Sequence, residues 1–167
     1  MIRIPDGVRP WIIPLSLMVF FFFLPLQCFI IGDGLGLGVQ GAVYRYQITG
    51  SGISLIPVTY EIGYVTSGIY DGKTAVSVII WATGTFILAC TLMLCLIHTN
   101  RKNHPRLRVV TIGIAGSCIL YFVSLVAQYG VFFSGPAGIS LPAGIIMMVL
   151  FASFLYGNRD CFTNTTT

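Results

Sequence analysis

The chain has 167 residues, of which 56% are hydrophobic and only 8% are charged. Soluble domains carry roughly 25% charged residues, so this composition indicates a membrane protein, and the length suits one domain over residues 1–167. The net charge of +4 is small, and we attribute it to membrane topology and to attraction between basic residues and anionic lipid headgroups. A basic docking patch for a cytoplasmic protein is the alternative. No nucleic-acid partner is predicted.

Four long apolar runs contain no Asp, Glu, Lys, Arg or His. They cover residues 11–31, 75–97, 109–133 and 139–156. The first run would be about 31 Å long as a helix, which matches a hydrocarbon core of about 30 Å. We therefore predict an all-α membrane protein, a four-transmembrane-helix bundle. A small extracytoplasmic antiparallel β-hairpin or sheet would lie between its first and second helices.

Basic residues are divided unevenly between the two sides of this predicted bundle. One side would hold seven of them: Arg3, Arg9, Arg101, Lys102, Arg106, Arg108 and Arg159. The other side would hold only Arg45 and Lys73. Because cytoplasmic loops of membrane proteins carry an excess of Lys and Arg, we expect a multi-pass protein of the cell membrane whose N- and C-termini are cytoplasmic.

The predicted outward loop covers residues 32–73 and contains two strand-like stretches, 42–49 and 53–65. Apolar and aromatic residues alternate with polar ones in both stretches, and this period of two predicts β-strands. Residues 49–52 are Thr-Gly-Ser-Gly, which suits the turn of a hairpin. In the second stretch the apolar positions include Tyr60 and Tyr64.

The apolar, Tyr-rich face of this hairpin is the candidate interaction surface. Its residues are Tyr44, Tyr46, Ile48, Tyr60 and Tyr64. A two-stranded hairpin is marginally stable in water by itself, so its apolar face needs a cover. Two alternatives remain open: the hairpin closes over its own helix bundle, or it meets a neighbouring subunit through a Tyr-rich surface or a strand edge.

Small residues are the candidate helix-packing positions, because helices in lipid associate mainly through close packing. The candidates are Ala75, Ala82, Ala89, Gly84, Gly113, Gly116 and Gly144. Two buried amides, Gln27 and Gln128, are added to this set because they would lie at similar depth. Each amide would bond a nearby backbone group or an interfacial water, or the two amides would bond each other.

Residues with catalytic potential show no useful pattern. The five cysteines form no CxxC pair, and His98 and His104 have no Cys or carboxylate ligand close in sequence. We predict no catalytic, cofactor-binding or metal-binding residues, and we expect that the protein is not an enzyme. A cation held by Asp33, Glu61 and Asp71 is the alternative for the outward loop.

The order and size of the predicted elements resemble those of the claudin class of tetraspan proteins. The resemblance implies a four-helix bundle whose first outward loop is rich in β-structure. It is one of topology alone, because residues 33–72 contain no Trp and no Cys and so lack the signature of that class. No functional residue is carried over from it.

The expected function is that of a non-enzymatic structural or assembly protein of the membrane. It would make lateral contacts through its outward loop and its lipid-facing helices. The expected partners are the lipid bilayer and either copies of the same chain or other membrane subunits. Two alternatives are an accessory subunit of a larger redox or transport complex and a small protein that handles lipids or quinones.

Overall fold

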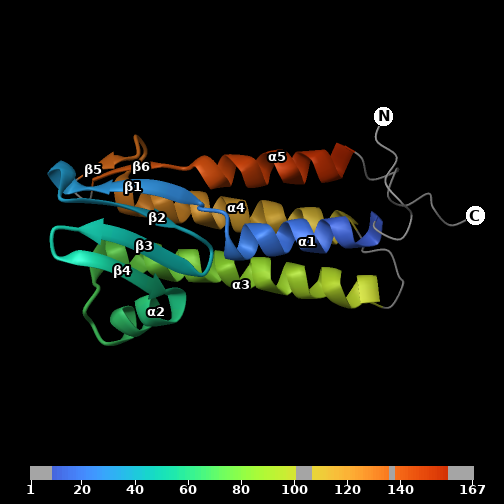
Figure 1. Ribbon diagram of the computed structural model, residues 1–167, viewed down its shortest axis with the longest axis horizontal. Helices are drawn as coiled ribbons and strands as arrows, with labels where there is room; N and C mark the ends of the chain where they lie inside the picture. The colour runs from blue at the N-terminus through green and yellow to red at the C-terminus, as the bar shows by residue number, and fades with distance from the viewer. Residues whose placement is uncertain (1–8, 101–106, 136–137, 158–167) are drawn as a thin grey trace, which may run out of the picture.

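The computed structural model describes residues 9–100, 107–135 and 138–157. In them the chain forms five α-helices, one short 3-10 helix and a six-stranded antiparallel sheet (Figure 1). The helices are α1 (Arg9–Phe22), α2 (Val58–Thr66), α3 (Gly72–Asn100), α4 (Leu107–Tyr129) and α5 (Ala143–Gly157), with the 3-10 helix at Gly32–Gly34. The strands are β1 (Gln27–Ile31), β2 (Gly36–Gln40), β3 (Tyr44–Thr49), β4 (Gly52–Pro57), β5 (Ser134–Gly135) and β6 (Gly138–Leu141).

The predicted four-transmembrane-helix bundle is wrong. Only two helices of the described chain are long and apolar enough to cross a membrane, within Gly72–Thr99 and Arg108–Tyr129. Helices α1 and α5 have 14 and 15 residues, about 21 and 22 Å, which is shorter than a hydrocarbon core of about 30 Å. The predicted hairpin is present as β3 and β4, but it is one edge of a six-stranded sheet.

Proline and glycine end the helices earlier than the apolar runs predicted. Helix α1 ends at Phe22, because Pro25 lacks an amide hydrogen and disfavours helical backbone at the residue before it. Residues 27–31, placed in the first predicted span, instead form β1. Helix α4 ends at Tyr129 and is followed by Gly130 at a φ of 82°, a usual way to end a helix. Helix α5 begins only after Pro142.

Residues 58–66 form helix α2 and not the second half of a strand, which corrects the strand predicted over 53–65. Pro57 ends β4 in an extended conformation, with φ −63° and ψ 151°. Val58 and Val65 pack against the core and Glu61 between them is buried. Spacings of three and four residues put all three on one side of a helix, a pattern that competes with the period of two in the same segment.

The sheet lies beside one half of the long helices α3 and α4, and helices α1 and α5 lie beside the other half (Figure 1). The sheet, in the order β4-β3-β2-β1-β6-β5, accompanies the N-terminal half of α3 and the C-terminal half of α4. Its β2–β3 turn is anchored to α3 by two hydrogen bonds. The Trp81 indole donates to the carbonyl of Gly41 at 3.1 Å, and the Thr85 hydroxyl donates to the carbonyl of Ala42 at 2.6 Å.

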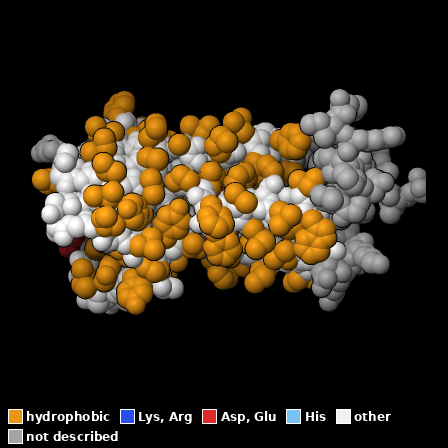
Figure 2. Space-filling model, viewed as in Figure 1, with side chains coloured by type: hydrophobic (Ala, Val, Ile, Leu, Met, Phe, Trp, Pro, Cys, Tyr) orange, Lys and Arg blue, Asp and Glu red, His pale blue; other side chains and the backbone are white. Residues whose placement is uncertain are grey.

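The long helices expose much of their apolar surface. In the most apolar stretch of each helix, only 44% of α3 and 39% of α4 is buried. The core helix of a soluble protein is mostly buried. Figure 2 shows apolar side chains over both the helical half and the sheet half of the visible face. These features suit membrane association of α3 and α4.

Candidate interaction surface

The two sides of the sheet differ sharply in composition. The side that faces the helices carries most of the polar residues, and its buried ones include Gln27, Gln40, Arg45 and Ser140. The Arg45 guanidinium lies 6.0 Å from the centre of the Trp81 ring of α3. The polar side of the sheet is thus its buried side.

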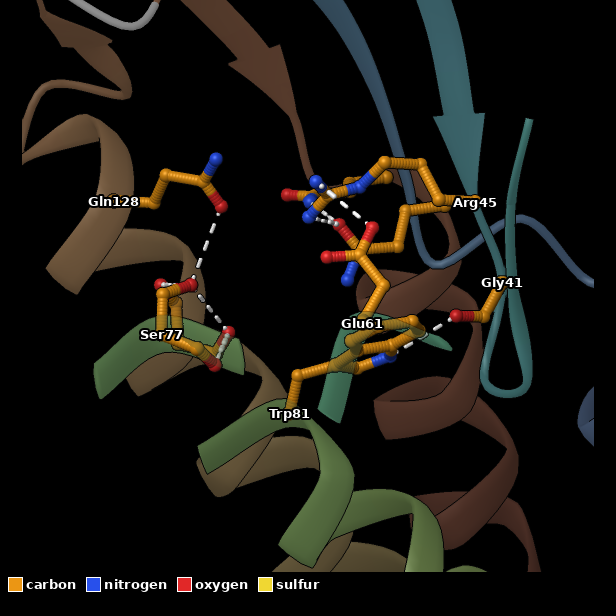
Figure 3. Close-up of polar contacts among 9 residues, drawn as sticks. Gly41, Arg45, Glu61, Ser77, Trp81 and Gln128 are labelled. Atoms are coloured by element: carbon orange, nitrogen blue, oxygen red, sulfur yellow. Dashed lines mark hydrogen bonds and ion pairs between the residues drawn. The ribbon is translucent and has the colours of Figure 1, made fainter. Parts of the chain in front are cut away.

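These buried polar groups bond to one another in a chain across the sheet, which ends at Arg45 and Glu61 (Figure 3). The Ser140 hydroxyl of β6 donates to the side-chain oxygen of Gln27 at 3.0 Å, and the Gln27 amide donates to Gln40 Oε1 at 2.5 Å. Arg45 donates to the same oxygen at 3.3 Å. The chain ends in an ion pair, in which Arg45 Nη1 lies 3.1 Å from Glu61 Oε1. The network therefore joins β6, β1, β2, β3 and α2.

The ion pair lies in an environment that disfavours charge. Glu61 is fully buried and Arg45 is 8% exposed. Burial raises the pKa of the Glu61 carboxyl above its usual value, and the Arg45 guanidinium opposes part of this rise. Burial, and then the nearby Glu61 carboxylate, also raise the pKa of Tyr70. Glu61 Oε2 and Arg45 Nε find no hydrogen-bond partner among the described residues. The two side chains therefore contact each other, but some of their buried polar atoms make no hydrogen bond.

The outward side of the sheet is apolar across five strands. The pairing of neighbouring strands brings its side chains into two continuous rows. The distal row, farther from α1, consists of Ile53, Ile48, Leu37, Ile30 and Ile139. The proximal row, nearer to α1, consists of Leu55, Tyr46, Val39, Cys28 and Leu141.

The distal row is well exposed, from 39% at Ile48 to 69% at Ile53. In an antiparallel sheet of a soluble protein the apolar side packs on the core and the polar side faces water. Here this arrangement is reversed, because the polar side covers the helices and the apolar side is free. A contiguous exposed apolar patch of this kind is typical of an interaction site.

The structure divides the predicted interaction residues between two elements. Tyr44, Tyr46 and Ile48 lie on the outward side of β3, opposite to Arg45, and the Tyr44 hydroxyl donates to the carbonyl of Phe23 at 3.5 Å. Tyr60 and Tyr64 lie on helix α2 and so do not share that side. Tyr60 is exposed, whereas the Tyr64 ring packs edge-on against Tyr70 with ring centres 5.4 Å apart.

The predicted packing glycines lie in different surroundings. A methyl group added at Gly84 would press on Tyr121, one at Gly113 would overlap Thr91, and one at Gly144 would overlap the Pro25 carbonyl. A methyl group at Gly116 would have no described atom within 4 Å. Ala75, Ala82 and Ala89 are half-buried on α3.

Gln27 and Gln128 do not meet. Gln27 bonds Gln40 and Ser140, as described above, whereas Gln128 Oε1 accepts a hydrogen bond from Ser77 at 3.2 Å (Figure 3). Ser77 and Ser124 also bond each other's backbone carbonyls at 2.9 and 2.8 Å. Gln128 therefore belongs to a polar contact between α3 and α4, and Gln27 to the network under the sheet.

Sequence reasoning missed the network residues Gln40, Arg45 and Glu61. The sequence pattern predicts Arg45 as an outward basic residue and offers Glu61 as a candidate cation ligand. The alternation of polar and apolar residues did reveal two faces, but it contains no information on which face the helices cover. The signal that remained unused was Glu61 itself, a lone acid at helical spacing between Val58 and Val65.

The described residues contain no group of three His, Cys, Asp or Glu side chains placed to hold a metal ion. Five of the basic residues on which the predicted topology depends lie outside the part of the chain that the structure describes: Arg3, Arg101, Lys102, Arg106 and Arg159. No protein-family model matches the sequence, and no curated protein matches it significantly.

Proposed function

We propose that this protein is a structural assembly protein of the membrane that is not an enzyme, and that copies of it associate laterally through the distal and proximal rows. The observation that supports this proposal is the reversed sheet, whose polar side covers the helices while its apolar side is exposed. The polar groups beneath the sheet bond mainly to one another. We assign them a role in stability.

In this proposal α3 and α4 both cross the membrane. Arg101, Lys102 and Arg106 lie between α3 and α4 in the sequence, and Arg108 lies in the first turn of α4. Because cytoplasmic segments carry an excess of basic residues, we propose that the α3–α4 connection is cytoplasmic. The start of α1 and the end of α5 lie at the same end of the molecule (Figure 1). Both termini are therefore proposed to be cytoplasmic.

The position of the sheet along α3 supports a protein partner for the distal row. From the C-terminal end of α3 to Thr85 is about 22 Å, and Thr85 bonds Ala42 at the base of the sheet. A hydrocarbon layer of about 30 Å then extends about 8 Å further, which is between two and three strand residues at about 3.3 Å each. Its boundary falls between Tyr44 and Tyr46.

Lipid therefore covers only part of the apolar side. The proximal row, with Tyr46, falls in the headgroup region, where tyrosine is favoured. The distal row lies beyond it and faces water unless another protein covers it. A second copy presents the same two rows and no charged residue among them, so two copies match in chemistry.

The oligomeric state in a mild detergent tests this proposal. Replacing Leu37 and Ile48 together with Thr keeps β-propensity but removes apolar area from the distal row, so we expect the dissociation constant of the assembly to rise at least tenfold. The matched control replaces Ile62 and Ile69, which are exposed outside both rows, with Thr. It should leave the assembly unchanged.

A photo-crosslinking residue at position 37 provides the test in intact membranes. A crosslink between two copies of the chain is expected. Crosslinks only to a different polypeptide would instead support the accessory-subunit alternative. A wild-type chain that is monomeric in detergent and forms no crosslink in membranes would refute the proposal.

A further inference from the structure

A second apolar feature lies between α4 and α5, at the end of the molecule opposite to the sheet. It is a groove of about 410 Å³, a size typical of small-molecule sites. Small side chains on both walls create it: Ala115 on α4, and Ala152, Ser153 and Gly157 on α5. The large apolar residues Ile119 and Val149 also line it, so a ligand in the groove would contact mainly hydrocarbon.

A basic residue precedes the groove on the α4 wall. Thr111 lines the groove, and Arg108 precedes it by three residues, which puts the two side chains on the same face of α4. Arg108 is exposed and lies in the first turn of α4. The helix N-terminus adds a partial positive charge at the same place. A ligand that combines an apolar chain with an anionic group complements both features.

We propose that this groove binds one acyl chain of an acidic phospholipid, with the lipid phosphate against Arg108. The exposed Tyr156 lines the groove near the same end, and tyrosine is favoured at the level of lipid headgroups. This inference rests on the membrane placement proposed above, but it is independent of the proposed assembly, because no residue of the two rows lines the groove.

Native mass spectrometry of the detergent-solubilised chain tests the inference, with phosphatidylglycerol and phosphatidylcholine added in turn. The wild type should retain phosphatidylglycerol in preference to phosphatidylcholine. Arg108→Gln should reduce this preference about fivefold, since one basic residue near a lipid surface contributes about that factor. Equal retention of the two lipids by the wild type, or an unchanged preference in Arg108→Gln, would overturn the proposal.

Filling the groove tests the site of the acyl chain. Ala115→Phe should abolish the preferential retention of phosphatidylglycerol, whereas Ile112→Phe, on the same helix but outside the groove and 69% exposed, should not. Ser153→Leu fills the groove from the α5 wall and should give the same loss, which guards against misfolding of a single variant. Retention at the wild-type level in both groove variants, or a polypeptide in place of the lipid, would overturn the proposal.

The two proposals fail separately. Ala115→Phe should keep the wild-type oligomeric state, and the double replacement of Leu37 and Ile48 with Thr should keep the bound phosphatidylglycerol. If lipid retention is lost in the Leu37 and Ile48 variant as well, the groove is not the lipid site, and the lipid instead occupies the interface between copies.

Discussion

Arg45 and Glu61 form a buried ion pair that joins strand β3 to helix α2, with 3.1 Å between Nη1 and Oε1. The pair stands at the end of the polar network under the sheet and holds α2 beside that network. The polar side of β3 is its buried side, where Arg45 contacts Glu61 and Gln40.

Breaking the ion pair from one side should destabilise the fold strongly. Arg45→Met leaves the buried Glu61 carboxyl without its partner, and such a change typically costs about 3–5 kcal/mol. The double variant Arg45→Met, Glu61→Leu should recover most of this loss, because no buried charge remains. The free energy of unfolding in mixed detergent micelles measures both effects. A single variant within about 1 kcal/mol of the wild type would contradict this account.

Stability should depend on pH through Glu61. Its pKa in the folded chain is raised above the usual 4.5, so the folded state binds this proton more tightly than the unfolded state does. The resulting stabilisation is complete below pH 4.5 and is lost as the pH rises through the folded pKa. Glu61→Gln lacks this titration and serves as the reference.

The measured quantity is the unfolding free energy of the wild type minus that of Glu61→Gln, followed as a function of pH. We expect this difference to fall as the pH rises from 4.5 to the folded pKa, and then to become level. A difference that increases with pH over this range would mean that the attraction of Arg45 outweighs the burial of the carboxyl, and that the pKa is lowered.

Two glycines on neighbouring helices should respond in opposite directions to the same substitution. Gly144→Ala puts a methyl group into the carbonyl of Pro25 and within 2.8 Å of the Cα of Leu26, so we expect a loss of about 1–3 kcal/mol. Gly116→Ala meets open space and should gain about 0.5–1 kcal/mol in helix stability. Thermal unfolding of both variants measures these two changes in stability. Equal changes would show that local packing does not determine the effect of alanine at either position.

The amides should couple according to their positions in the structure. Gln27→Leu and Gln40→Leu remove the two ends of one hydrogen bond of 2.5 Å, so their effects on the unfolding free energy should depart from additivity by about 0.5–3 kcal/mol. Gln27→Leu and Gln128→Leu act in separate clusters and should add within about 0.5 kcal/mol. Coupling of Gln27 to Gln128 and not to Gln40 would contradict the network.

Part of this architecture was predictable from the residues alone. The uncharged run at 75–97 lies wholly within α3, because a long apolar segment with no Pro and one tolerated Gly favours an uninterrupted helix. The alternation over 42–49 corresponds to β3, and the Gly-rich turn after it leads into β4. These features depend on local backbone preference and on spacing, both of which are properties of the sequence.

The errors had a different origin. The apolar composition of residues 27–31 and 139–141 is typical of helices, yet these segments pair with each other as strands, and residues 27–31 also pair with β2. A short apolar run suits a buried helix or a strand equally well, and Pro25, Gly138 and Pro142 set the choice by limiting the helices. Strands β1 and β6 lie far apart in the sequence, so no local pattern reveals their pairing.

By itself, then, the sequence determined the apolar character of the chain, its two long helices and the two faces of its central hairpin. Only the tertiary structure decided which face is buried. An alternating strand exposes either side equally well, and in the structure Arg45 lies on the buried side of β3, paired with Glu61 of α2. Because the strands pair in register, that one choice turns the apolar residues of five strands outward together.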